Sequence, residues 1–398
     1  MSWLTAPIFP RVRPPFWLLV AITASGTLAM HILVPTLPLA AVDLNASSSA
    51  IQLAITLYLF GVAFGQLLYG PISDRFGRRP VLLVALIAYV LASIVAGLAS
   101  NLPVLLAARV VQALGGCGGL VLGRAVVRDG AAQGQAASQM ALLTMTQSVA
   151  PGIGPAIGGY LGAWFGWRSI FAALVGVGGA TLAATLLILP ETASSRGVAT
   201  GSMLTSYMRL LRMPNFRGFM LGGAFTSTSI YAYLAASPFI FTQMLHRPAE
   251  EAGIYYLAIM AGVPIGSFAA SRLARRMPLD KLLRLSNAIA FIGAAILFAI
   301  TLSGHLSVAG VICPMLLYSI GVGATSPIAL SSAIGAQPMM IGAASGLYGF
   351  TQMMFGALCT LVVGFWPSNP ALTASAILLC ATLAGQIAFI GAGRARPI

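Results

Sequence analysis

The chain of 398 residues is strongly apolar: hydrophobic residues make up 59% of it, charged residues only 7%, and the formal net charge is +14. A soluble domain carries about 25% charged residues, so a water-soluble globular protein is excluded. A nucleic-acid-binding protein would gather its positive charges on one soluble face, and the sequence has no such face.

Apolar runs long enough to cross a membrane recur through the whole chain. In chain order they predict twelve spans, at residues 17–36, 52–70, 81–99, 103–123, 138–162, 169–189, 217–242, 253–271, 285–303, 307–328, 341–365 and 371–391. The first run is longer than the apolar core of a signal peptide, so we interpret it as a retained span. The predicted fold is an all-α membrane protein with twelve transmembrane helices in two six-helix bundles.

The basic residues are distributed unequally between the loops on the two sides of these spans. One side carries eighteen Lys and Arg residues, the other side carries only Arg168 and Arg247, and Arg109 lies within a span. Cytoplasmic loops are enriched in Lys and Arg. We therefore expect a multi-pass membrane protein with both termini in the cytoplasm.

A short basic motif occurs twice. The stretch GPISDRFGRRP begins at Gly70, and its arginines recur 197 residues later in SFAASRLARRM, so that Arg75, Arg78 and Arg79 correspond to Arg272, Arg275 and Arg276. The second copy has Ser271 and Ala274 where the first has Asp74 and Gly77, so we expect it to act mainly in setting orientation.

A polar stretch divides the chain into two parts. We predict an N-terminal six-helix bundle at 1–190, a cytoplasmic linker at 191–216 with a short surface helix near its end, and a C-terminal six-helix bundle at 217–398. Two halves that repeat a motif in parallel are typical of secondary transporters. A receptor or a channel does not predict such a repeat.

Three motifs carry a resemblance to a known family. The pattern from Gly70 to Arg79 resembles the loop between spans two and three of the major facilitator superfamily, and RVVQALGG, with Arg109 and Gln112, is similar to its span-four motif, with Ala113 where glycine is usual. The stretch PGIGPAIGG in span five is similar to the motif of the drug:proton antiporter branch. Across the whole chain the sequence most resembles the bicyclomycin and chloramphenicol resistance (Bcr/CflA) group.

The resemblance implies a role for each motif. Asp74 would face the start of span eleven, where the helix dipole favours a negative charge. A conformational latch between the halves would then contain Gly70, Asp74, Arg75, Gly77, Arg78, Arg79 and Asp129; the alternative is that its arginines only set orientation.

In span five, Pro155 would bend the helix, while small residues would let it approach span eight near Gly262 and Gly266. The antiporter helix motif contains Gly154, Pro155, Gly158 and Gly159. Simple helix packing is the alternative interpretation.

An antiporter needs a titratable group, yet none of the seven carboxylates falls deep in a span. The stretch HILVPTLP places His31 where similar sequences have Asp, and histidine titrates near neutral pH. His31, Arg109 and Gln112 are therefore the predicted proton-coupling and substrate residues, although a structural histidine remains the alternative. Asp43 is a rival proton collector or a helix cap.

The predicted cavity candidates are Tyr58, Gln147, Tyr231, Tyr233 and Gln352.

These predictions indicate a proton-coupled, alternating-access exporter of drugs or other small molecules, acting as a monomer without a cofactor or a metal. The alternative is a transporter of a small polar or anionic metabolite that works without protons. The sequence lacks the zinc-binding, nucleophile-elbow and phosphate-binding motifs of common enzymes and pumps, so we expect no enzyme. The substrate and the proton stoichiometry are not determined by these patterns.

Overall fold

A computed structural model of the protein describes residues 14–130, 136–192, 203–336, 340–366 and 368–394, and every regular element within these ranges is a helix. Ten helical stretches among them are long and apolar enough to cross a membrane. The two other predicted spans, 138–162 and 217–242, fall on α6 (Ala136–Phe165) and on α9 (Pro214–Thr228) followed by α10 (Ile230–Phe239). The all-helical membrane fold is confirmed.

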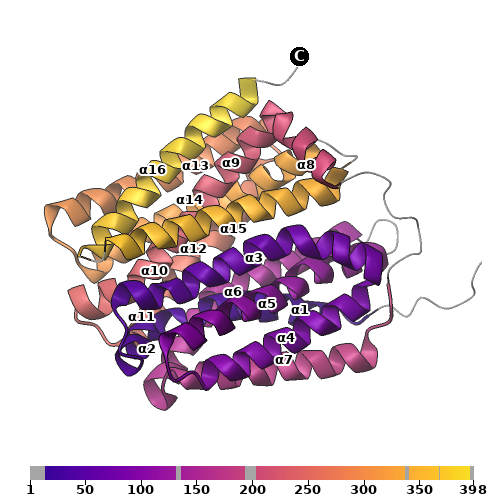
Figure 1. Cartoon of the computed structure of the whole chain (residues 1–398). Helices are drawn as coiled ribbons and strands as arrows, with labels where there is room; N and C mark the ends of the chain where they lie inside the picture. The colour runs from indigo at the N-terminus through magenta and orange to yellow at the C-terminus, as the bar shows by residue number, and fades with distance from the viewer. Residues whose placement is uncertain (1–13, 131–135, 193–202, 337–339, 367, 395–398) are drawn as a thin grey trace, which may run out of the picture.

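The first half of the chain forms long helices joined by short turns (Figure 1). Its elements are α1 (Phe16–His31), the 3-10 turn η1 (Val34–Thr36), α2 (Leu37–Asp43), α3 (Ser48–Phe76), α4 (Arg78–Gly97), α5 (Leu102–Gly130), α6 and α7 (Arg168–Ile188). The predicted first span is not one straight helix. Because Pro35 has no N–H to donate to the carbonyl of His31, α1 ends at His31.

The second half begins with a short surface helix, as predicted, and then continues with longer ones. Its elements are α8 (Met203–Arg212), α9, α10, the π-helical turn η2 (Ile240–Met244), α11 (Ala249–Met260), α12 (Gly262–Leu273), α13 (Leu279–Ser303), α14 (Val308–Gly335), α15 (Ile341–Phe365) and α16 (Pro370–Arg394). The predicted eighth span is broken between α11 and α12, since Pro264 cannot donate to the carbonyl of Met260.

The arginine motif is not the loop that its charge suggests. Helix α3 continues through Asp74 to Phe76, and Gly77 alone separates it from α4. Gly77 has a φ of +92°, a conformation that glycine adopts without steric cost. The end of the molecule at Gly77 is called the arginine end below, and the opposite end, where α3 begins at Ser48, is called the far end.

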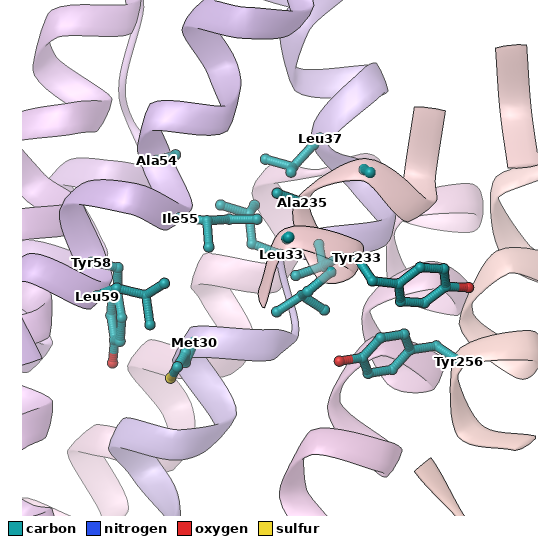
Figure 2. Packing of buried hydrophobic residues seen from close by; sticks show 14 of the residues in the cluster. Met30, Leu33, Leu37, Ala54, Ile55, Tyr58, Leu59, Tyr233, Ala235 and Tyr256 are labelled. Carbon is teal, nitrogen blue, oxygen red and sulfur yellow. The ribbon is translucent and has the colours of Figure 1, made fainter. Parts of the chain in front are cut away.

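The helices of the two halves meet mainly at two pairs of helices and at the end of α1. Helix α3 lies beside α15 (Figure 1). Helix α6 packs against α11, and η1 contacts α10 and α11. One apolar core runs through both halves at these contacts. Figure 2 shows part of it, with Leu33 and Ile55 from the first half near Ala235, Tyr233 and Tyr256 from the second.

The glycines of α6 pack against a different partner from the one expected. A Cβ at Gly154 would lie 3.3 Å from the Cβ of His31, and a Cβ at Gly158 would collide with the carbonyl of Ile32. Gly262 and Gly266 instead face the backbone of α14. The predicted eighth span does contact α6, but the contact is made by Gly253 on α11, which faces the carbonyl of Pro155. The glycine face therefore fixes the end of α1.

We predict that Gly158→Ala destabilises the protein by about 1–3 kcal/mol, because the added methyl meets backbone atoms that cannot rotate away. Gly176→Ala is the matched control: it lies on α7 and its Cβ would have no neighbouring atom within 4 Å. Thermal unfolding in detergent measures both variants. Equal unfolding temperatures for the two would contradict the close contact.

Candidate functional site

The guanidinium of Arg109 lies at the centre of a buried polar network. Arg109 is 0% exposed. Its Nε donates to the carbonyl of Ala54 (3.3 Å), and its Nη1 donates to the carbonyl of Ala29 (3.0 Å) and to Oε1 of Gln112 (2.6 Å). The ring of Tyr58 lies under the guanidinium carbon, 4.1 Å from it. Helices α1, α3 and α5 thus each provide a hydrogen-bond acceptor for the guanidinium of Arg109.

The partners of Arg109 are themselves held in place. Gln112 follows Arg109 by three residues, which puts both on one face of α5, and its Nε2 donates to the hydroxyl of Ser93 on α4 (2.7 Å). This second hydrogen bond turns the amide oxygen toward Arg109. The hydroxyl of Tyr58 donates to the carbonyl of Gly26 (2.7 Å). Arg109 and Gln112, two of the predicted coupling residues, thus contact each other directly.

The positive charge of Arg109 has no carboxylate partner in the described part of the chain. Its Nη2 is buried and has no hydrogen-bond acceptor. Leaving a buried donor unpaired costs about 1–3 kcal/mol. The network therefore retains a donor that an anionic or carbonyl-bearing molecule can satisfy.

His31, the last residue of α1, is 3% exposed. Its Nδ1 lies 2.9 Å from the carbonyl of Thr27, and because a carbonyl only accepts, Nδ1 must carry a proton. Nε2 is then the atom that gains or loses a proton. His31 is within electrostatic reach of Arg109, and the ring of Tyr231 on α10 lies 6.1 Å away.

Two tyrosines of the second half stack near this site. The rings of Tyr233 on α10 and Tyr256 on α11 are 6.5 Å apart and nearly parallel (Figure 2). The Tyr233 hydroxyl is buried without a partner. Tyr256 was not among the predicted cavity residues. It is an amphipathic residue in an apolar span, which is the reason Tyr233 was chosen, so the same criterion could have found it.

The other predicted cavity residues do not all lie in this cluster. Tyr58 supports Arg109 with its ring, and Tyr231 contacts Met30, with 3.8 Å between its hydroxyl and the sulfur. Gln352 is half-buried on α15, and no hydrogen bond joins it to this network. The side chain of Gln147 lies outside the described residues. The structure thus gathers His31, Arg109, Gln112, Tyr58 and Tyr231, with Tyr233 beside them.

Arg78 is the centre of the predicted latch at the arginine end. It lies 2.7 Å from a carboxylate oxygen of Asp74, donates through Nε to Asp129 (3.1 Å), and also bonds to the hydroxyl of Ser73. The carbonyl of Gly70 accepts from Ser73 (3.0 Å). Arg78 is 8% exposed, so these bonds join α3, α4 and α5 in a largely buried position.

Glu191, the first residue of the predicted linker, also belongs to this cluster, which the sequence did not predict. Its carboxylate accepts from the backbone N–H groups of Arg78 (3.0 Å) and Arg79 (3.2 Å), the first residues of α4. Arg79 in turn donates to the carbonyl of Leu186 on α7 (2.9 Å). A Cβ at Gly77 would lie 2.7 Å from the Glu191 carboxylate, so glycine is needed there for space as well as for its φ.

Two members of the motif lie at the edge of this cluster. The side chain of Asp74 is 60% exposed, and residues 337–339, which precede α15, lie outside the described residues. The proximity of Asp74 to that helix start therefore stays a prediction. Arg75 lies over the ring of Phe76 (5.2 Å), and in the second copy Arg272 lies over Phe268 in the same way (5.1 Å).

The expectation that Asp43 caps the next helix is wrong. The hydroxyl of Ser47 caps α3 instead, by accepting from the N–H of Ala50 (3.1 Å). Asp43 forms an ion pair with Arg168 and accepts from the indole of Trp167 (3.2 Å). Because both partners stand at the start of α7, Asp43 joins α2 to α7 at the far end.

Comparison with known proteins agrees with this arrangement. The chain is 30% identical over 376 residues to an uncharacterized MFS-type transporter, YdgK, of Bacillus subtilis, covering 93% of each chain. It is 31% identical over 365 residues to a chloramphenicol resistance protein of Pseudomonas aeruginosa, covering 90% of this chain and 85% of the other. The crystal structure of a D-xylose–proton symporter has the same fold, with a TM-score of 0.75 at 14% identity over 92% of this chain and 95% of the other.

The family model of the major facilitator superfamily matches residues 18–360. This match includes the arginine motif, the Arg109 network and the glycines of α6. The chain belongs to the major facilitator superfamily, a family of transporters.

Proposed function

We propose that the protein is a proton-coupled exporter of drugs or other small molecules in the bacterial inner membrane, with both termini in the cytoplasm. The observation that carries the proposal is the buried Arg109, which keeps one donor unpaired beside a titratable histidine. The relatives include chloramphenicol, bicyclomycin and multidrug resistance proteins. We propose that the protein acts as a monomer and catalyses no chemical reaction.

In this proposal residues 1–190 and 217–398 are two units that rock about the central site. The contacts between α3 and α15 and between α6 and α11 would slide or separate during each cycle. The Arg78 cluster joins α3, α4 and α5 of the first unit to Glu191 at the start of the linker. We therefore assign it the role of stiffening the first unit and of coupling that unit to the linker.

His31 is the proposed proton carrier. Its Nδ1 is held by Thr27, so that Nε2 is available for a proton. The neighbouring charge of Arg109 disfavours protonation of the imidazole. An anionic or strongly polar substrate that occupies the free donor of Arg109 would weaken this repulsion, and substrate and proton binding would then influence each other.

A second candidate is a transporter of a small polar or anionic metabolite that works without protons, in which case His31 has only a structural role. It is favoured by the lack of a carboxylate beside Arg109 among the described residues. A cationic drug would find no counter-charge there, whereas an anion would.

The test of export uses an efflux-deficient bacterium that produces the protein, challenged with neutral, cationic and anionic antibiotics. Resistance to some of them, with accumulation restored by a proton-gradient uncoupler, supports proton-driven export. Resistance that the uncoupler leaves intact supports a proton-independent transporter. No resistance to any compound, with the protein present in the membrane, contradicts drug export and favours the metabolite.

We predict that Arg109→Gln lowers export about tenfold or more, because hydrogen bonds from a charged group are worth about 1.5–3 kcal/mol each. Arg109→Lys should fail as well, since an ammonium group cannot span the carbonyls of Ala29 and Ala54 and the amide of Gln112 together. Initial rates of uptake into inverted vesicles measure both.

Arg124→Gln is the matched control for loss of an intramembrane charge. Arg124 lies on the same helix, and its Nε donates to the carbonyl of Leu120 one turn earlier (3.0 Å), which does not join α5 to another helix. An equal loss of export in this variant would mean that the charge of α5, and not the Arg109 network, is what transport requires.

We predict that His31→Gln abolishes substrate-induced proton release while substrate binding remains. Glutamine can still donate to the carbonyl of Thr27, but it cannot titrate. Proton release from the purified protein is followed with a pH indicator at several pH values on both sides of neutrality. If release is unchanged, His31 has no part in coupling.

We predict that Arg78→Gln lowers export about threefold to tenfold, because it removes the ion pairs with Asp74 and Asp129 that join α3, α4 and α5. Arg75→Gln, which alters an exposed contact with Phe76, should keep export near the wild-type rate. Adding Asp129→Asn to Arg78→Gln should lower export little further, since the two residues act through one ion pair. Equal losses for Arg75→Gln and Arg78→Gln would show that only the total charge matters.

A further inference from the structure

A hollow of about 250 Å³ lies at the far end between the two halves of the chain. Its walls come from the first turns of α3 and the last turns of α15, with Ser49, Gln52 and Thr56 on one side and Thr360 and Gly364 on the other. This is separate from the Arg109 network, which lies among α1, α3, α4 and α5.

Gln52 is the polar group that this hollow leaves unsatisfied. The side chain is 2% exposed, and its amide oxygen is buried without a hydrogen-bond partner. A Cβ placed on Gly364 would lie 3.6 Å from that oxygen, so the oxygen is directed at the opposite wall. Burying an amide without a partner is unfavourable, and a donor from a bound molecule would relieve that cost.

The floor of the hollow is a hydrogen bond between the two halves. The hydroxyls of Thr56 on α3 and Thr360 on α15 are 2.8 Å apart and both are buried. Each hydroxyl also lies near a carbonyl of its own helix, Thr360 at 2.8 Å from that of Ala357 and Thr56 at 3.4 Å from that of Gln52. Because the contact of Thr360 is the shorter one, we assign Thr56 as the donor of the bond between the helices. This bond must break whenever α3 and α15 separate at the far end.

We propose that this hollow is a second binding site on the transport path, at which the exported molecule rests after the Thr56–Thr360 bond has opened. The inference rests on the proposed function as an exporter. The site takes a small molecule, or one end of a larger one, that carries a hydroxyl or an N–H group, because the free group of Gln52 is an acceptor. Thr56 and Thr360, once separated, offer two further hydroxyls to the passing molecule.

Among the described residues that form its walls, none is charged. The oxygen of Gln52 therefore accepts from a hydrogen-bond donor of any net charge, and the two threonine hydroxyls can donate or accept, whereas Arg109 binds acceptors and anions. A substrate that bears both kinds of group satisfies the two sites in sequence. Chloramphenicol, which carries hydroxyls, an amide N–H and a nitro group, is a suitable probe.

The test measures whether the probe occupies the hollow. The variant Gly364→Cys, in a background with Cys313→Ala and Cys380→Ala, is labelled from the far side with a small maleimide, with and without chloramphenicol. We expect chloramphenicol to slow labelling at least threefold, and we expect the protection to disappear when Gln52→Leu is added. Ser303→Cys, exposed at the far end of α13, is the control that chloramphenicol should not protect.

Transport by the same variants separates this inference from the proposed function. Gln52→Leu and Thr56→Val, each close in volume to the original residue, should lower chloramphenicol export about threefold to tenfold, the range expected for one hydrogen bond. If the wild type exports chloramphenicol but the thiol of the Gly364→Cys variant is unprotected, and Gln52→Leu and Thr56→Val both export normally, the second site is refuted while export stands. If the wild type exports no compound of the panel, the proposed function fails, and with it the site as a station on an export path.

Discussion

One buried positive charge organises the first half of this protein. Arg109 has no carboxylate beside it among the described residues, so its charge is held by backbone carbonyls of α1 and α3, the amide of Gln112 and the ring of Tyr58. Carbonyl dipoles stabilise a cation only when they are close and fixed. Helices α1 and α5 therefore have to approach each other tightly, and at their crossing Gly26 faces Gly116, where a Cβ on Gly26 would lie 2.5 Å from a backbone oxygen.

Prolines decide where the helices around this charge end. Pro35 stops α1 at His31, and Pro264 stops α11 four residues earlier, at Met260. The end of α1 is then fixed by the glycines of α6, which leave no room for a side chain between the helices. The same residues that resemble an antiporter motif thus hold the proposed proton carrier at a defined position beside Arg109.

The polar contacts at the two ends of the bundle differ in what they connect. At the arginine end, polar contacts join elements of the first half and the linker: Arg78 joins α3 to α5, and Glu191 binds the start of α4. At the far end, the bond between Thr56 and Thr360 crosses between the halves. Near the centre, Tyr231 contacts Met30 and lies beside His31, which also joins the two halves. A step that opens the far end must break the Thr56–Thr360 contact.

The sequence by itself determined the helical membrane class, because apolar runs of spanning length have no other stable arrangement in lipid. It also placed Arg109 and Gln112 together in one span, three residues apart and so on one face of a helix. Local patterns could not reveal three contacts: the hydrogen bonds from the start of α4 to Glu191, the ion pair between Asp43 and Arg168, and the hydrogen bond between Thr56 and Thr360. Thr56 and Thr360 are 304 residues apart in the chain. Only the tertiary structure decided these contacts, since they depend on which helix ends pack together, and hydropathy gives each helix a length but not a neighbour.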